Sequence, residues 1–147
     1  MKERYLYRGK RIDTGKWVEG SLVTGVFFRL GKEIPYMFCP NLADYDCFED
    51  FSEENGIFEV DPSTICQCTG LKDKNGKLIW ENDIVTYWDT YSTESGQAEE
   101  YCIGKVVWDD ETISFQVTNR LSAESWEVLD ECLVLGNAFD NPELLEV

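Results

Sequence analysis

Residues 64–85 of this chain read TICQCTGLKDKNGKLIWENDIV, and they contain the clearest structural signal in the sequence. Asn75-Gly76 separates two segments of strand-forming residues, at 66–73 and 78–80. Asn and Gly both tolerate a positive φ, which the two-residue turn of a tight hairpin requires. We therefore predict a β-hairpin here, followed by a second reversal at 81–83 that leads into the next strand.

Similar segments recur along the rest of the chain and are separated by turn residues. They are rich in Tyr, Val, Ile, Phe and Trp, as is typical of β-strands that pack on one face. The long second segment is expected to bend at Gly20 or Gly25, where no side chain opposes a bulge. Besides the two hairpin strands, strands are predicted at 5–8, 16–30, 34–39, 57–60, 83–87, 101–108, 113–117 and 126–135.

Two stretches carry helical signals. Asn141-Pro142-Glu143 combines an N-cap residue, proline at the first helical position and a carboxylate near the positive end of the helix dipole. One short C-terminal helical turn is therefore predicted. Tyr45, Phe48 and Phe51 recur three residues apart, which indicates a second short helix at 46–51.

Charge and composition narrow the classes of function. The 147 residues carry 29 acidic and 13 basic side chains, a formal net charge of −16, which disfavours a polyanionic partner such as duplex DNA. The chain has no histidine, so the Ser-His, Cys-His and His-ligated metal sites of most small hydrolases are excluded. Carboxylates are concentrated in the segment 44–61, which we interpret as a solvated loop or a short exposed helix.

The six cysteines, at 39, 47, 66, 68, 102 and 132, are expected to be reduced thiols, because the charged start of the chain lacks the apolar run of a secretory signal. Structural zinc favours two to four residues between paired thiolates, and only Gln67 separates Cys66 from Cys68. The segment 44–61 does not match the register of a calcium loop. We expect no metal, no cofactor, no membrane span and a cytoplasmic location.

The stretch 64–85 also resembles the signature of the YopX family of phage and prophage proteins. Further similarity lies in the opening at 7–10 and 16–20, in the strand at 104–108 and in the ending at 135–145. The resemblance implies a β-rich protein of a bacterial host cell, with a C-terminal part like an SH3 barrel and no catalytic residues. Asn82 stands where the family generally has glycine in a Glu-Gly-Asp turn, and asparagine enters the left-handed region at modest cost.

With this resemblance the fold class is mainly β. We expect an N-terminal β-region at 1–82 with an irregular acidic loop, then an SH3-like β-barrel at 83–147; one compact unit over the whole chain is the open alternative. Ile84 and Val85 would supply the first interior side chains of the barrel, and Trp108, Phe115 and Leu133 would complete them.

Three motifs invite a chemical interpretation, and a structural one is favoured for each. Asp13-Thr14-Gly15 spells the aspartic-protease triplet, but the basic residues around it indicate a hairpin loop. Lys72, Asp73 and Asp83 flank tight turns, where charged residues are ordinarily solvated. The five Trp residues could stack single-stranded nucleic acid only beside a positive groove, and 83–147 contains only two basic residues.

The sequence thus favours a non-enzymatic protein-interaction module whose acidic surface contacts a host or phage protein, with no catalytic, cofactor-binding or metal-binding residue assigned. Two alternatives stay open. One is an acidic DNA mimic that inhibits a host nucleic-acid-binding protein; the other is an enzyme that uses the carboxylates of Asp13 or of the segment 44–61. Association of identical chains through an exposed strand edge is also open.

Overall fold

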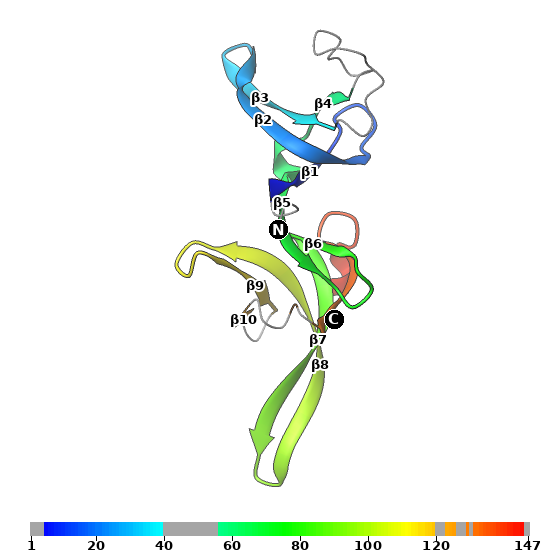
Figure 1. Cartoon of the computed structure of the whole chain (residues 1–147), viewed down its shortest axis with the longest axis vertical. Helices are drawn as coiled ribbons and strands as arrows, with labels where there is room; N and C mark the ends of the chain where they lie inside the picture. Colours follow the sequence, from blue (N-terminus) through cyan, green and yellow to red (C-terminus); the bar gives the residue numbers. More distant parts are fainter. Residues whose placement is uncertain (1–4, 40–55, 120–122, 126–128, 130, 146–147) are drawn as a thin grey trace. The chain divides into compact units, whose positions relative to one another are not determined.

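The computed structural model describes residues 5–39, 56–119, 123–125, 129 and 131–145, and their regular structure is mainly β. Two antiparallel sheets account for it, so the mainly-β prediction is confirmed. The chain divides into two compact units, Met1–Cys68 and Thr69–Val147 (Figure 1). The observed division comes earlier in the chain than the one expected at 82/83. Leu71 and Ile79, from the hairpin at 66–80, pack in the core of the second unit, and this part of the hairpin therefore belongs to that unit.

The first unit is built on strands in the order β4-β3-β2-β1-β5, and β5 continues into the second unit, where β6 extends the same order. Val18, Met37, Cys39, Phe58 and Val60 form its buried core. The strands are β1 (Tyr7–Lys10), β2 (Trp17–Arg29), β3 (Lys32–Phe38), β4 (Ile57–Glu59) and β5 (Cys66–Lys72), with a 3₁₀ turn, η5, at Pro62–Thr64.

Two glycines fix the shape of β2. A Cβ at Gly20 would lie 2.0 Å from the carbonyl oxygen of Phe38, so β2 and β3 can approach this closely only with glycine. Gly25 has a φ of 74°, and the β2–β3 register shifts between Val23 and Phe27. Of the two predicted bends, the one at Gly25 is therefore the bulge.

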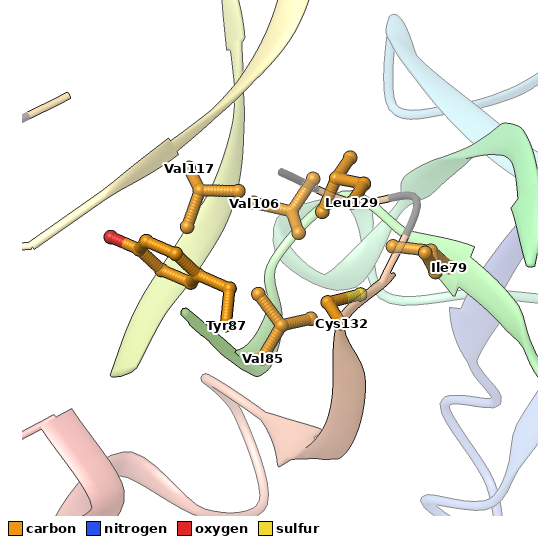
Figure 2. Close-up of a cluster of buried hydrophobic side chains, with 7 residues drawn as sticks. All are labelled: Ile79, Val85, Tyr87, Val106, Val117, Leu129 and Cys132. Atoms are coloured by element: carbon orange, nitrogen blue, oxygen red, sulfur yellow. The ribbon is translucent and has the colours of Figure 1, made fainter. Parts of the chain in front are cut away.

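The second unit contains a five-stranded sheet in the order β10-β9-β8-β7-β11. Its core contains Ile79, Val85, Tyr87, Val106, Val117, Leu129 and Cys132, which Figure 2 shows close together. The first five lie in strands, and Leu129 and Cys132 precede β11. The elements are β6 (Leu78–Trp80), β7 (Asp83–Thr93), β8 (Gly96–Asp109), β9 (Ser114–Thr118), β10 (Ala123–Ser125), β11 (Leu133–Asn137) and the 3₁₀ turn η7 (Pro142–Leu145).

Several sequence predictions are confirmed in this unit. The hairpin at Asn75-Gly76 is present, but its turn is not the two-residue type: Gly76 has a φ of 80°, Asn75 does not have a positive φ, and Gly76 N–H donates to Asp73 O at 3.0 Å. Asn82 adopts a φ of 69° at the second reversal. Ile84 and Val85 are fully buried. The C-terminal helical turn is the 3₁₀ segment η7.

Other predictions need correction. The single strand expected at 126–135 is wrong, because Cys132 lies outside any strand and β11 begins at Leu133. Trp108 is not an interior residue: it is 41% exposed, and its indole Nε1 donates to Asp110 Oδ1 at 2.8 Å. The helix expected at 46–51 lies outside the described residues, as does most of the acidic segment. Closure of an SH3-like barrel stays a prediction.

The largest difference concerns β7 and β8, which are much longer than the strands expected at 83–87 and 101–108. They pair without a register shift from Ile84↔Lys105 out to Thr93↔Gly96. Figure 1 shows the outer part of this hairpin extending beyond the rest of its sheet. We call residues 88–101 the β7–β8 arm.

Candidate functional site

Asp73 is a buried carboxylate of the second unit, at the start of the Asn75-Gly76 turn. Its Oδ1 accepts hydrogen bonds from the backbone N–H groups of Asn75 and Lys77, both at 2.9 Å, and its Oδ2 accepts one from Val134 N–H at 3.0 Å. The side chain is 7% exposed. Burial acts to raise its pKa, but the three N–H donors and the Lys77 charge outweigh burial, and the pKa is lowered.

Asp83 has a related role at the next reversal. It is 1% exposed, and its Oδ2 accepts a hydrogen bond from Trp80 N–H at 2.8 Å. Asn82 donates its backbone N–H to Val106 O at 2.8 Å and accepts from Ala138 N–H at 2.9 Å. The expectation that Asp73 and Asp83 are solvated ends is therefore wrong: both are buried acceptors that hold turns in place. Lys72, by contrast, is exposed.

The C-terminal ending uses asparagine side chains in the same way. Asn137 Oδ1 accepts from the N–H groups of Phe139 and Asp140, at 3.0 and 2.9 Å, while Asn141 Oδ1 accepts from Asn137 N–H at 3.2 Å. A Cβ at Gly136 would lie 2.2 Å from Asn141 Oδ1, so a larger residue there would displace the Asn141 side chain from this bond. The side chains of Asn137 and Asn141 thus stabilise the backbone conformation of the C-terminal turn.

Asp13, from the protease-like triplet, lies in an exposed turn of the first unit. Arg11 donates to both of its oxygens, from Nε at 2.9 Å and from Nη2 at 2.6 Å, and this pairing lowers the pKa of Asp13. A protease dyad needs a second carboxylate and a shared proton instead. The hollow beside it, lined also by Ile12, Phe58 and Glu59, measures about 40 Å³, which is room for only a few water molecules.

The described cysteines and the remaining described acidic residues do not form a metal site. No group of three His, Cys, Asp or Glu side chains with metal-binding geometry exists among the described residues. Cys66 and Cys68 are both fully buried in β5, and no disulfide joins the cysteines that the structure describes. Of the segment 44–61, Glu59 pairs with Arg29 at 3.4 Å and Asp61 caps η5.

Two surfaces stand out as exposed and aromatic or apolar. The first is the end of the β2–β3 hairpin, where Val26, Phe28 and Leu30 are 63%, 63% and 98% exposed. The hairpin is ordered there, since the Gly25 N–H donates to a Glu33 carboxylate oxygen and the Phe27 and Tyr36 rings lie 4.4 Å apart. We call Val26, Phe28 and Leu30 the apolar tip.

The second surface is the β7–β8 arm. Trp88 and Tyr101 face one another across the two strands, with ring centroids 4.6 Å apart and an edge-to-face angle of 73°. They are nevertheless 52% and 49% exposed. The Tyr101 hydroxyl lies 2.9 Å from Thr86 Oγ1, which fixes the orientation of the ring pair.

The arm is acidic and contains no basic residue, a property that it shares with residues 33–71. Glu94, Glu99 and Glu100 are exposed on it, and the sequence contains no Lys or Arg between Lys77 and Lys105. These carboxylates therefore have no neighbouring cation within the arm. An ordered aromatic pair beside uncompensated carboxylates is suited to contact a positively charged surface.

The sequence alone does not identify Trp88 or Tyr101 as candidate site residues. The segment 89–100 is polar and lacks the alternation of apolar residues that predicts a strand. The available signal was a tryptophan beside a long stretch without any basic residue. The structure adds the cross-strand register that brings this tryptophan against Tyr101.

In the part of the chain that the structure describes, no helix is long and apolar enough to cross a membrane. A solved structure, "Crystal structure of protein EF1440 from Enterococcus faecalis", matches with 24% sequence identity and a TM-score of 0.47, over 95% of this chain and 96% of the other. No curated protein matches. The model of the YopX protein family matches residues 6–146, nearly the whole chain. This chain therefore belongs to the YopX family.

Proposed function

We propose that this chain is a non-enzymatic interaction protein that binds a positively charged protein partner through the β7–β8 arm. The observation that carries the proposal is the exposed Trp88–Tyr101 pair beside three exposed glutamates with no cation between Lys77 and Lys105. Exposed aromatic residues of this kind are enriched in the energetically dominant parts of interfaces.

The other polar features of the second unit support this assignment indirectly. Asp73, Asp83, Asn137 and Asn141 are engaged with backbone N–H groups, so their side chains serve the fold. The arm residues hold no comparable structural position, since Trp88 and Tyr101 lie half in solvent. In keeping with the family resemblance, we place this interaction in the cytoplasm of a bacterial cell that carries the phage or prophage.

The proposal is tested by affinity purification from bacterial lysate with quantitative mass spectrometry. Three forms of the full chain are compared: the wild type, the arm variant Glu99→Lys/Glu100→Lys, and the control variant Glu131→Lys/Glu143→Lys. Both variants change the net charge equally and replace exposed glutamates of the same unit. We expect a partner that the wild type and the control retain and the arm variant loses.

A salt series sharpens the result. Binding that depends on exposed carboxylates should weaken as the Debye length falls from about 10 Å at 0.1 M to about 3 Å at 1 M. Equal recovery of every partner by the arm and control variants would overturn the proposal. A captured partner that duplex DNA displaces would instead favour the DNA-mimic alternative.

A further inference from the structure

The two strands of the arm have open outer edges. β11 pairs with β7 only along Asp83–Thr86, and the first β8 residue that pairs with β9 is Lys105. Among the described residues, no strand therefore lies beside 88–93 of β7 or 96–101 of β8 on the side away from the hairpin partner. Every second backbone N–H and C=O group along such an edge points outward.

These edges lack several of the features that prevent strand addition. Natural edge strands are commonly protected by charged side chains, above all lysine, by proline or by a β-bulge. The arm contains neither lysine nor proline, and its ladder runs without a register shift from Ile84 to Thr93. Its charged side chains are all carboxylates, which repel an acidic strand but not a basic one. A regular edge of this kind is the geometry that accepts an additional strand from another chain.

The charge of the arm determines which kind of strand can pair with its open edges. A second copy of the arm would place Glu94, Glu99 and Glu100 of one chain beside the same carboxylates of the other, and like charges on adjacent strands are destabilising. An extended segment with Lys or Arg at alternate positions would place its cations on one face of the sheet. On the face of the Trp88–Tyr101 pair they would lie near Glu99, whereas Glu100 points to the opposite face.

We infer that the arm binds its partner by β-strand addition: an extended, basic segment of the partner pairs with an outer edge of the β7–β8 hairpin. The inference rests on the proposed function and adds the mode of recognition. Backbone hydrogen bonds supply regular pairing, and the glutamates and the aromatic pair select for basic side chains.

The test uses the full chain, labelled with ¹⁵N, and three synthetic peptides. The probe is KTKVKTKVK. The first control has the same sequence with N-methyl groups on residues 4 and 5, which interrupts both edges of the peptide without changing its charge. The second control, ETEVETEVE, reverses the charge. Amide hydrogen exchange and chemical-shift titration are followed for residues 88–101.

The probe is expected to slow exchange at alternate residues along one edge of the arm by about tenfold or more at saturation, and to bind about tenfold more tightly than the N-methylated control. The acidic peptide should not bind. Equal affinities for the probe and the N-methylated control, or binding without alternate protection of the arm, would overturn strand addition.

The outcome separates this inference from the proposed function. If Glu99→Lys/Glu100→Lys abolishes partner capture while the probe and its N-methylated form bind the wild type equally, the arm recognises charge and strand addition is wrong. If the partner is retained by the Glu99→Lys/Glu100→Lys variant, the proposed function itself fails, whatever the peptides show.

Discussion

The two units are both antiparallel sheets with one long hairpin, but they differ in charge and in what the hairpin exposes. Met1–Cys68 carries eight basic and twelve acidic residues, a net charge of −4, whereas Thr69–Val147 carries five and seventeen, a net charge of −12. The β2–β3 hairpin exposes aliphatic and phenyl side chains at the apolar tip, and the β7–β8 arm exposes carboxylates and an aromatic pair. The same supersecondary structure therefore presents two different surfaces.

The units also differ in how they use turn carboxylates. Asp73 is buried and bonded to three backbone N–H groups, while Asp13 is exposed and paired with the Arg11 side chain. A carboxylate that satisfies buried N–H groups is structural, because those groups would otherwise lose their partners. The comparison predicts that equivalent substitutions at these two positions have very unequal effects.

The largest effect is expected for Asp73→Ala. Three charge-assisted hydrogen bonds are lost and the donors are left in a mostly buried turn, so the free energy of unfolding of the second unit should fall by about 4 kcal/mol. Urea titration followed by NMR signals of both units measures the change. Asp13→Ala is the matched control and should leave the midpoint of the first unit unchanged; equal effects of the two substitutions would contradict the comparison.

Asp73 also makes the second unit sensitive to acid. Its pKa is lower in the folded state than in the unfolded chain, so its stabilising contribution is complete above the unfolded pKa of about 3.9 and is lost as the pH falls through the lower folded value. Asp73→Asn should therefore flatten the pH dependence of unfolding in this acidic range. An unchanged acid dependence in the variant would show that other carboxylates dominate it.

A smaller but still severe effect is expected in the first unit for Gly20→Ala. The added Cβ meets the Phe38 carbonyl oxygen, a backbone atom that can move only if β2 and β3 separate. We expect a loss of about 3 kcal/mol, confined to the first unit. Gly104→Ala serves as comparison in the second unit, because the added Cβ would meet a Val117 methyl group at 2.6 Å and the Thr118 carbonyl oxygen only at 2.9 Å, a less severe backbone clash than at Gly20. A larger loss at Gly104 than at Gly20 would contradict this steric argument.

Local signals predicted much of this fold. Asn75-Gly76 and Asn82 have φ preferences that act within a few residues, and both turns are where the sequence places them. The core residues Ile79, Val85 and Val106 follow from strand segments rich in aliphatic side chains. In each case the deciding physical property belongs to the residue and its immediate neighbours.

The features that the sequence did not predict depend on contacts between residues that are far apart in the sequence. Nothing near Asp73 in the sequence indicates that Val134 will donate to it, so its burial could not be inferred from the turn alone. The arm escaped for a related reason: its polar strands are specified by cross-strand pairing rather than by an apolar face. The Trp88–Tyr101 pair is consequently visible only once the register is known.

The smallest effect, and one of opposite sign, is expected at Leu30. Leu30 and Asn82 have similar positive φ values, 52° and 69°, but only asparagine tolerates that region readily. Leu30 is 98% exposed and gains nothing from burial. Leu30→Asn should therefore stabilise the first unit by about 1 kcal/mol, and Asn82→Ala should destabilise the second by a similar amount.

Thermal unfolding monitored separately in each unit tests both substitutions. If Leu30→Asn fails to stabilise, the turn at Leu30-Gly31 is not strained and the two reversals are equivalent. If it does stabilise, the positive φ of Leu30 lowers the free energy of unfolding of the first unit, and asparagine at this position lowers it less. The apolar tip would then be a second candidate contact surface, beside the one that we propose on the β7–β8 arm.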